Sequence, residues 1–172
     1  MASYHRIYRI SLVLLLAAFS GCGGNEAPDI SAAAATERKK GDDFYDREDY
    51  DAAIACYNQV IRLKPDYASA YQRRGKAYYR KREYDKAIRD ATQAIRLDPD
   101  DAWAYYDRGE AYRWKREYDK TIKDYTQSIR LDPDNAFAYS HRSAVYVLKG
   151  DLQKAKADFD KAKALRAKAS QN

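Results

Sequence analysis

Apolar and small residues recur along this chain at helical spacing, in stripes that come in pairs. Tyr71, Gly75 and Tyr78 follow the i, i+4, i+7 spacing of one helix face. A second stripe with the same spacing follows, and small alanines stand at 87, 91 and 94. Because one stripe carries rings and the other small side chains, the two helices can pack closely. The pattern predicts an antiparallel helical hairpin.

The hairpin pattern repeats with a fixed period. Pro65, Pro99 and Pro133 lie 34 residues apart, and each ends a similar segment: AIACYNQVIRLKPD, AIRDATQAIRLDPD and TIKDYTQSIRLDPD. A period of this length indicates one helical unit that is stacked along a solenoid. Four units can be aligned, at 34–67, 68–101, 102–135 and 136–169. We therefore expect an all-α solenoid of about four helix-turn-helix units over residues 36–169, followed by a short tail at 170–172.

Proline and capping residues predict where the helices end and begin. The residue before a proline is pushed away from helical geometry, so the second helix of each unit should stop there. Asp101 and Asn135 then stand where the next helix needs an N-cap.

Taken together, these positions resemble the tetratricopeptide repeat, over nearly all of residues 34–169. In that family an aromatic, a small residue, a Tyr, an Ala, an aromatic, a small residue and a Pro recur, and the second and third units supply nearly all of them. The resemblance implies a right-handed α-solenoid. One departure concerns the turn inside each hairpin, where the family usually has Gly. Only Gly150 fits, while Glu48, Arg82 and Arg116 occupy the other turns, at a cost of a few tenths of a kcal/mol each if a left-handed conformation is needed.

Comparison of the units with one another predicts a set of ion pairs. An arginine on the first helix stands 16 residues before an aspartate on the second in three units, which gives Arg74 with Asp90, Arg108 with Asp124, and Arg142 with Asp158. In the first unit both members change together, to Lys40 and Cys56. We infer a partly buried structural bridge across each hairpin. The alternative is two unrelated surface charges.

The two ends of the array are also visible in the sequence. Isoleucines that should pack on the next unit, at 54/61, 88/95 and 122/129, become Lys156 and Lys163 in the fourth unit. A terminal repeat needs a polar outer face, so we expect the helix from Leu152 to about Lys168 to cap the stack. At the other end, Glu37 replaces the expected aromatic and Asp43 replaces a small apolar residue.

The N-terminus predicts export. Residues 1–21 contain Arg6 and Arg9, a short apolar run, and small residues that lead to Cys22, as in a secretory signal. The segment FSGC resembles the lipobox of bacterial lipoproteins, in which the cysteine is lipidated, although Phe19 stands where that motif prefers Leu. An ordinary secretory signal and an unprocessed anchor remain alternatives. Residues 22–35 are expected to be the lipidated cysteine and a flexible tether.

Lipidation at Cys22 would place the protein on a membrane surface that faces away from the cytoplasm. This is the periplasmic face of the outer membrane in a two-membrane envelope, and otherwise the extracellular face of the plasma membrane. The formal charge is +6, and +4 remains without the signal's two arginines. So mild an excess does not indicate a nucleic-acid partner.

Catalysis finds little support in the sequence. His141 is the only histidine after the signal, and no grouping of residues indicates a metal site. Cys56 has no partner for an internal disulfide, so it is either a packed apolar-like residue or a lone thiol. We expect a non-enzyme with no cofactor.

The resemblance implies that the first helix of each unit lines a concave groove for a partner protein or peptide. Carried over by position, the lining is Tyr45, Arg73, Lys76, Tyr79, Arg80, Trp103, Tyr106, Asp107, Glu110, Arg113, Trp114, Phe137 and His141. Aromatic and arginine side chains are favoured at interface hot spots. The alternative is that some of them simply pack between units.

The sequence thus predicts a membrane-anchored scaffold or adaptor of the cell envelope. A lipoprotein that binds small molecules or cell-wall glycans through the same aromatics is the alternative function. Some family members clamp a C-terminal carboxylate with Lys and Asn, but Asn is missing from those positions here, so we do not transfer that activity.

Overall fold

The computed structural model describes residues 30–170. The predicted signal, Cys22 and the first part of the predicted tether lie outside these residues. Within them the chain forms helices and no strand: α1 (Ile30–Asp46), α2 (Tyr50–Leu63), α3 (Ala68–Arg80), α4 (Tyr84–Leu97), α5 (Ala102–Trp114), α6 (Tyr118–Leu131), α7 (Ala136–Leu148) and α8 (Leu152–Ala169).

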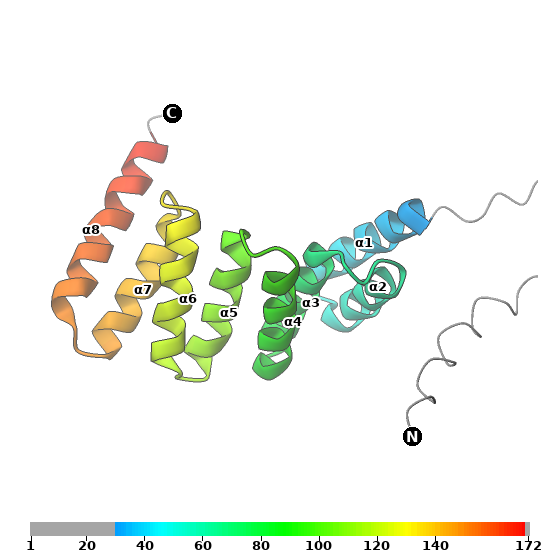
Figure 1. The fold of residues 1–172 in the computed structure, drawn as a ribbon, viewed down its shortest axis with the longest axis horizontal. Coiled ribbons are helices and arrows are strands. Elements are labelled where there is room, and N and C mark those ends of the chain that lie inside the picture. Colours follow the sequence, from blue (N-terminus) through cyan, green and yellow to red (C-terminus); the bar gives the residue numbers. More distant parts are fainter. Residues whose placement is uncertain (1–29, 171–172) are drawn as a thin grey trace, which may run out of the picture.

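Consecutive helices form four antiparallel hairpins that stack in a row (Figure 1). The second helix of each hairpin packs on the first helix of the next, and α3 also contacts α5. The expected all-α solenoid is confirmed. Among the described helices, none is long and apolar enough to cross a bilayer.

Caps and prolines set the helix boundaries as the sequence predicts. The side chain of Asp101 accepts hydrogen bonds from the backbone N–H groups of residues 103 and 104, and Asn135 does the same for residues 137 and 138. These bonds satisfy donors that a helix start leaves unpaired. The helices α2, α4 and α6 each end two residues before a proline.

The three predicted ion pairs are present. Nε and Nη2 of Arg108 donate to the two carboxylate oxygens of Asp124, both at 2.8 Å, and the other two pairs have the same fork geometry. Each arginine also reaches back to the preceding hairpin. Its Nη1 donates to a polar side chain there, which is Asn58, Thr92 or Thr126. One guanidinium therefore joins three helices.

The outer face of α8 is charged, as the sequence predicts, because Lys156 and Lys163 are exposed. Two apolar side chains of α8, Leu152 and Phe159, are exposed as well. Phe159 occupies the position that Tyr57 and Tyr125 fill in earlier units, where those rings are buried. The end of the stack is thus only partly polar.

The flexible tether that we expected at residues 22–35 is too long, because its last residues are helical. Helix α1 begins at Ile30, inside the segment 22–35 that we expected to be flexible. Alanine has the highest helix propensity, and the run of four alanines at 32–35 continues the helix. Ala34 is buried against Val60 and Ala70, which anchors this additional turn to the second helix and the next hairpin.

The turns inside the hairpins do require a left-handed residue. Glu48, Arg82 and Arg116 have φ near +61°, and Gly150 has φ +79°. A side chain in this conformation brings Cβ close to the backbone, and glycine avoids that contact.

We predict that Arg82→Gly and Arg116→Gly each stabilise the protein, by about 0.5–1 kcal/mol, because they relieve this steric cost. Thermal unfolding followed by circular dichroism measures the effect. The matched control is Gly150→Ala, which should lower the melting temperature. A lower melting temperature for both arginine variants would contradict the assignment of strain to these turns.

Candidate functional site

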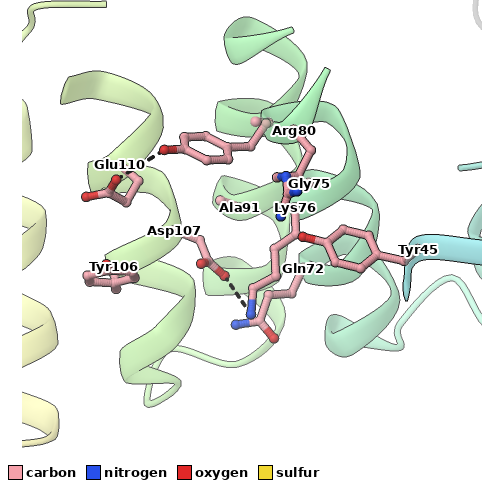
Figure 2. A pocket seen from close by; sticks show the side chains of 11 residues that line it. Tyr45, Gln72, Gly75, Lys76, Arg80, Ala91, Tyr106, Asp107 and Glu110 are labelled. Carbon is pink, nitrogen blue, oxygen red and sulfur yellow. Dashed lines mark hydrogen bonds and ion pairs between the residues drawn. The ribbon is translucent and has the colours of Figure 1, made fainter. Parts of the chain in front are cut away.

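The concave side of the solenoid contains a cavity of about 270 Å³ between α3 and α5. Figure 2 shows α3 on one side, with Gln72, Lys76 and Arg80, and α5 on the other, with Tyr106, Asp107 and Glu110. Tyr45 of α1 closes the far edge. The complete lining is Tyr45, Gln72, Gly75, Lys76, Tyr79, Arg80, Ala87, Ala91, Tyr106, Asp107 and Glu110.

A second hollow of about 160 Å³ adjoins the first. It lies between α1 and α3 and is lined by Asp42, Tyr45, Asp46, Tyr57, Gln72, Arg73 and Lys76. Three of these residues line both hollows, so the concave face forms a continuous groove over the first three hairpins.

A carboxylate and a basic side chain meet across each junction between hairpins in this groove. Arg73 donates to Asp42 at 2.6 Å, and Nζ of Lys76 lies 3.5 Å from Asp107. The third pair joins His141 to Glu110, with Nδ1 lying 2.6 Å from Oε1. The charge order is inverted at the middle junction, where the cation comes first in the chain.

Glu110 is the most fully bonded group in the groove. It is buried and accepts hydrogen bonds from Tyr125, from Arg113 at 2.8 Å, and from Tyr79 at 3.2 Å, in addition to His141. Burial alone would raise the pKa of Glu110. The hydrogen bonds from His141, Arg113 and Tyr125 outweigh that effect and hold the pKa at about 2. This carboxylate therefore stays charged and fixes the rings around it.

Asp107 has the opposite environment. Its Oδ2 atom is buried without a hydrogen-bond donor, and the nearest cation is Lys76 at 3.5 Å. Burial raises the pKa of Asp107 to about 7, although Lys76 acts to lower it. Nε2 of Gln72 is also buried without a partner. The cavity thus contains polar atoms whose hydrogen-bonding capacity is unused.

The groove aromatics differ in what they contact. Trp103 is 42% exposed, with its ring edge-to-face on Tyr106, and Phe137 is 57% exposed. Trp114 instead stacks on Tyr84 of α4, and its Nε1 donates to the hydroxyl of Tyr79 at 2.7 Å. Trp114 therefore also packs between units, although it is 52% exposed, and all three rings offer free surface.

The structure brings most of the predicted groove residues together, and the larger cavity or the smaller one includes Tyr45, Arg73, Lys76, Tyr79, Arg80, Tyr106, Asp107 and Glu110. Arg113 and His141 do not line either hollow, but both form hydrogen bonds with Glu110, which does. The sequence interpretation missed Asp42, Gln72 and the small residues Gly75 and Ala91. The signal for Ala91 was available, because the first and third units carry tyrosine at its aligned position.

The part of the chain that the structure describes contains no group of three or more potential metal ligands. Cys56 is partly buried, and burial raises the pKa of its thiol.

Comparisons with known proteins agree with this architecture. Models of the tetratricopeptide repeat match residues 41–82, 75–113, 102–135 and 138–168. A search of curated proteins found no match.

Several solved structures are similar. The crystal structure of MamA has 29% identity, a TM-score of 0.77 and coverage of 81% of both chains. MamA 41-end from Desulfovibrio magneticus RS-1 has 25% identity, a TM-score of 0.73 and coverage of 78% of this chain and 76% of that one. The first TPR of Spaghetti (RPAP3), bound to the HSP90 peptide SRMEEVD, has 26% identity, a TM-score of 0.68 and coverage of 70% and 95%.

We predict a pH-dependent gain in stability for Asp107→Asn. A raised pKa means that the folded state keeps its proton while the unfolded state loses it, so the contribution of Asp107 to stability falls between pH 4 and 7. The asparagine variant should therefore gain about 2–4 kcal/mol relative to wild type from pH 4 to pH 8, at about 1.4 kcal/mol per pKa unit. Urea unfolding at both pH values measures this, with exposed Asp134→Asn as control. A pH-independent difference would contradict the assignment.

Proposed function

The chain belongs to the tetratricopeptide repeat family, and from this membership we propose that it is an adaptor that binds a partner segment in its concave groove. The fold is that of a protein-interaction scaffold, and the similar repeat domain of Spaghetti (RPAP3) was solved with a bound peptide. The observation that carries the proposal is the groove itself: a cavity flanked by exposed rings and charged side chains.

The exposed rings of Trp103 and Phe137 are suited to anchor a partner. Nζ of Lys76 lies 6.0 Å from the centre of the Trp103 ring, so the indole also has a cation beside it. Aromatic side chains bury much area at low entropic cost, and a few of them commonly carry most of an interface's energy. Both residues lie on the first helices of their hairpins, α5 and α7, as the interpretation of the groove requires.

We propose further that the adaptor is tethered to a membrane of the bacterial cell envelope through lipid on Cys22. The lipobox-like segment FSGC supports this, and Gly23 is not the Asp that commonly retains lipoproteins in the inner membrane. Since α1 begins at Ile30, the segment from Cys22 would place the first hairpin within about 26 Å of the anchor, at 3.3 Å per residue. The groove would then face partners near the membrane surface.

The groove is tested by capture of envelope proteins with wild type and with Trp103→Ala/Phe137→Ala. Loss of two hot-spot rings should weaken capture of a defined partner at least tenfold, because each ring typically contributes about 2 kcal/mol. The matched control is Phe159→Ala, which removes an equally exposed ring from α8, the last helix of the stack, where it lines neither of the two hollows.

Equal loss of the partner in the control, or full retention in the groove variant, would contradict binding in the groove. Retained protein partners with lost retention on cell-wall material would instead support a glycan-binding lipoprotein.

The anchor is tested by Cys22→Ser, with Cys56→Ser as the matched control. Each lipid methylene buried in the bilayer contributes about 0.8 kcal/mol, so loss of the chains should move the protein from the membrane fraction to the soluble fraction. Cys56→Ser should remain with the membrane. Membrane attachment of Cys22→Ser would contradict lipidation.

A further inference from the structure

One position in the repeat differs between hairpins in a way that creates the cavity. In the first and third hairpins a tyrosine of the second helix, Tyr57 or Tyr125, is fully buried against a glycine of the first helix. In the second hairpin the aligned residue is Ala91, which faces Gly75. The second hairpin lacks a ring at the place where its neighbours have one.

The glycine contacts show how closely the rings fit. A Cβ atom on Gly41 would lie 2.6 Å from the Tyr57 ring, and one on Gly109 would lie 2.8 Å from the Tyr125 ring. A Cβ atom on Gly75 would meet Asp90 and the backbone of α4, and no ring. Gly75 and Ala91 instead line the open cavity of about 270 Å³. A closed apolar cavity of about 150 Å³ is enough to bind benzene in other proteins.

The hydroxyl groups of Tyr57 and Tyr125 show which polar partners a ring at this position has. The hydroxyl of Tyr57 donates to Asp42 at 2.9 Å, and Arg73 of the next hairpin donates to the same oxygen. The hydroxyl of Tyr125 donates to Glu110, which also binds His141 of the next hairpin. Each hydroxyl therefore ends at a carboxylate that a basic side chain of the next hairpin also contacts.

The second hairpin has no hydroxyl and its pair is inverted: Lys76 is aligned with Asp42 and Glu110, and the carboxylate belongs to the next hairpin. Lys76 and Asp107 face each other across the junction, and the Oδ2 atom of Asp107 is buried without a donor. Nε2 of Gln72, which lines the same cavity, also lacks an acceptor. An unpaired buried polar atom costs free energy, so both atoms would gain from a ligand that hydrogen-bonds to them.

The chain's own tyrosines are not free to fill this space. Tyr79 is held by Glu110 and Trp114 through its hydroxyl. Tyr45 packs edge-to-face on Tyr50, at a centroid distance of 5.4 Å. Both rings line the cavity together with Gly75 and Ala91, which form its floor, and neither ring is free to occupy the position of Tyr57 or Tyr125.

We propose that this cavity receives a tyrosine side chain of the partner segment, with its ring over Gly75 and its hydroxyl donating to Asp107. This assignment rests on the proposed function, since the tyrosine would belong to the segment that occupies the groove. Tyr45, Tyr79 and Tyr106 surround the entering ring, and Lys76 stands beside its hydroxyl.

The probe for this site is N-acetyltyrosinamide, added at millimolar concentration to the full-length chain. Binding should shift the backbone amide signals of Gly75 and Ala91 in NMR spectra. N-acetylphenylalaninamide, which lacks the hydroxyl, should bind about tenfold more weakly, as expected for the loss of one hydrogen bond to a charged group. The same affinity for both probes would overturn the role of Asp107.

Ala91→Tyr supplies the missing ring from within, and it should abolish binding of the tyrosine probe while the melting temperature is kept or raised. The matched control is Arg89→Tyr, which adds the same side chain on an exposed position of α4 and should leave binding intact. Unchanged probe binding by Ala91→Tyr would overturn the proposal. p-Cresol has the ring and hydroxyl of tyrosine without its backbone. Binding of p-cresol without any binding of N-acetyltyrosinamide would therefore also overturn the proposal, because the cavity would not accept a tyrosine of a peptide segment.

Failure of this proposal and failure of the adaptor function give different results. If Ala91→Tyr still captures the partner that Trp103→Ala/Phe137→Ala loses, the groove binds its partner without a tyrosine in this cavity. If the probe binds the cavity but the groove variants retain every partner, the tyrosine site stands and the adaptor function fails.

Discussion

Each hairpin after the first is held in place by one arginine that contacts three helices. Arg108 forks onto Asp124 of its own hairpin and donates to Thr92 of the hairpin before it. The arginine side chains are 14–19% exposed and the aspartates 5–9% exposed, so both charges are largely withdrawn from water. Such a pair adds little net stability over apolar packing, but removal of one partner strands the other, at a cost of about 3–5 kcal/mol. The repeated contact therefore holds each hairpin together and adds one hydrogen bond to the hairpin before it.

Because these contacts and the packing between successive hairpins lie on the other side of the stack, the concave side is free to vary. The junction pairs in the groove show this variation, since Asp42 with Arg73 is followed by the inverted pair of Lys76 with Asp107. The replacement of a tyrosine by Ala91 belongs to the same variation. Places where a repeat departs from its own pattern without loss of the fold are expected to be functional. In this molecule those departures meet in one cavity.

The sequence was sufficient to predict what depends on periodicity: the four hairpins, the caps at Asp101 and Asn135, and the three ion pairs. It was insufficient where a residue's role depends on a neighbour distant in the chain. Residues 30–35 resemble a linker in composition, and the burial of Ala34 on Val60 and Ala70, which the sequence does not reveal, anchors them as a helix turn. Likewise, the sequence left open whether Trp114 lines the groove or packs between units, because its stacking on Tyr84 depends on how successive hairpins are placed. The replacement of tyrosine by Ala91 is visible in the sequence. That this replacement opens a cavity follows only from the contacts of the Tyr57 and Tyr125 rings with glycines of the first helices.

The central claim is that the arginine–aspartate pair acts as one unit in each hairpin, and a double-mutant cycle tests it most directly. The free energy of unfolding would be measured by urea denaturation for Arg108→Met, Asp124→Leu and the double variant. We expect each single substitution to cost about 3 kcal/mol and the double to cost little more than one single, because neither charge is then stranded. If the two losses simply add, the pair is not coupled, and the hairpin must be held together by its other contacts.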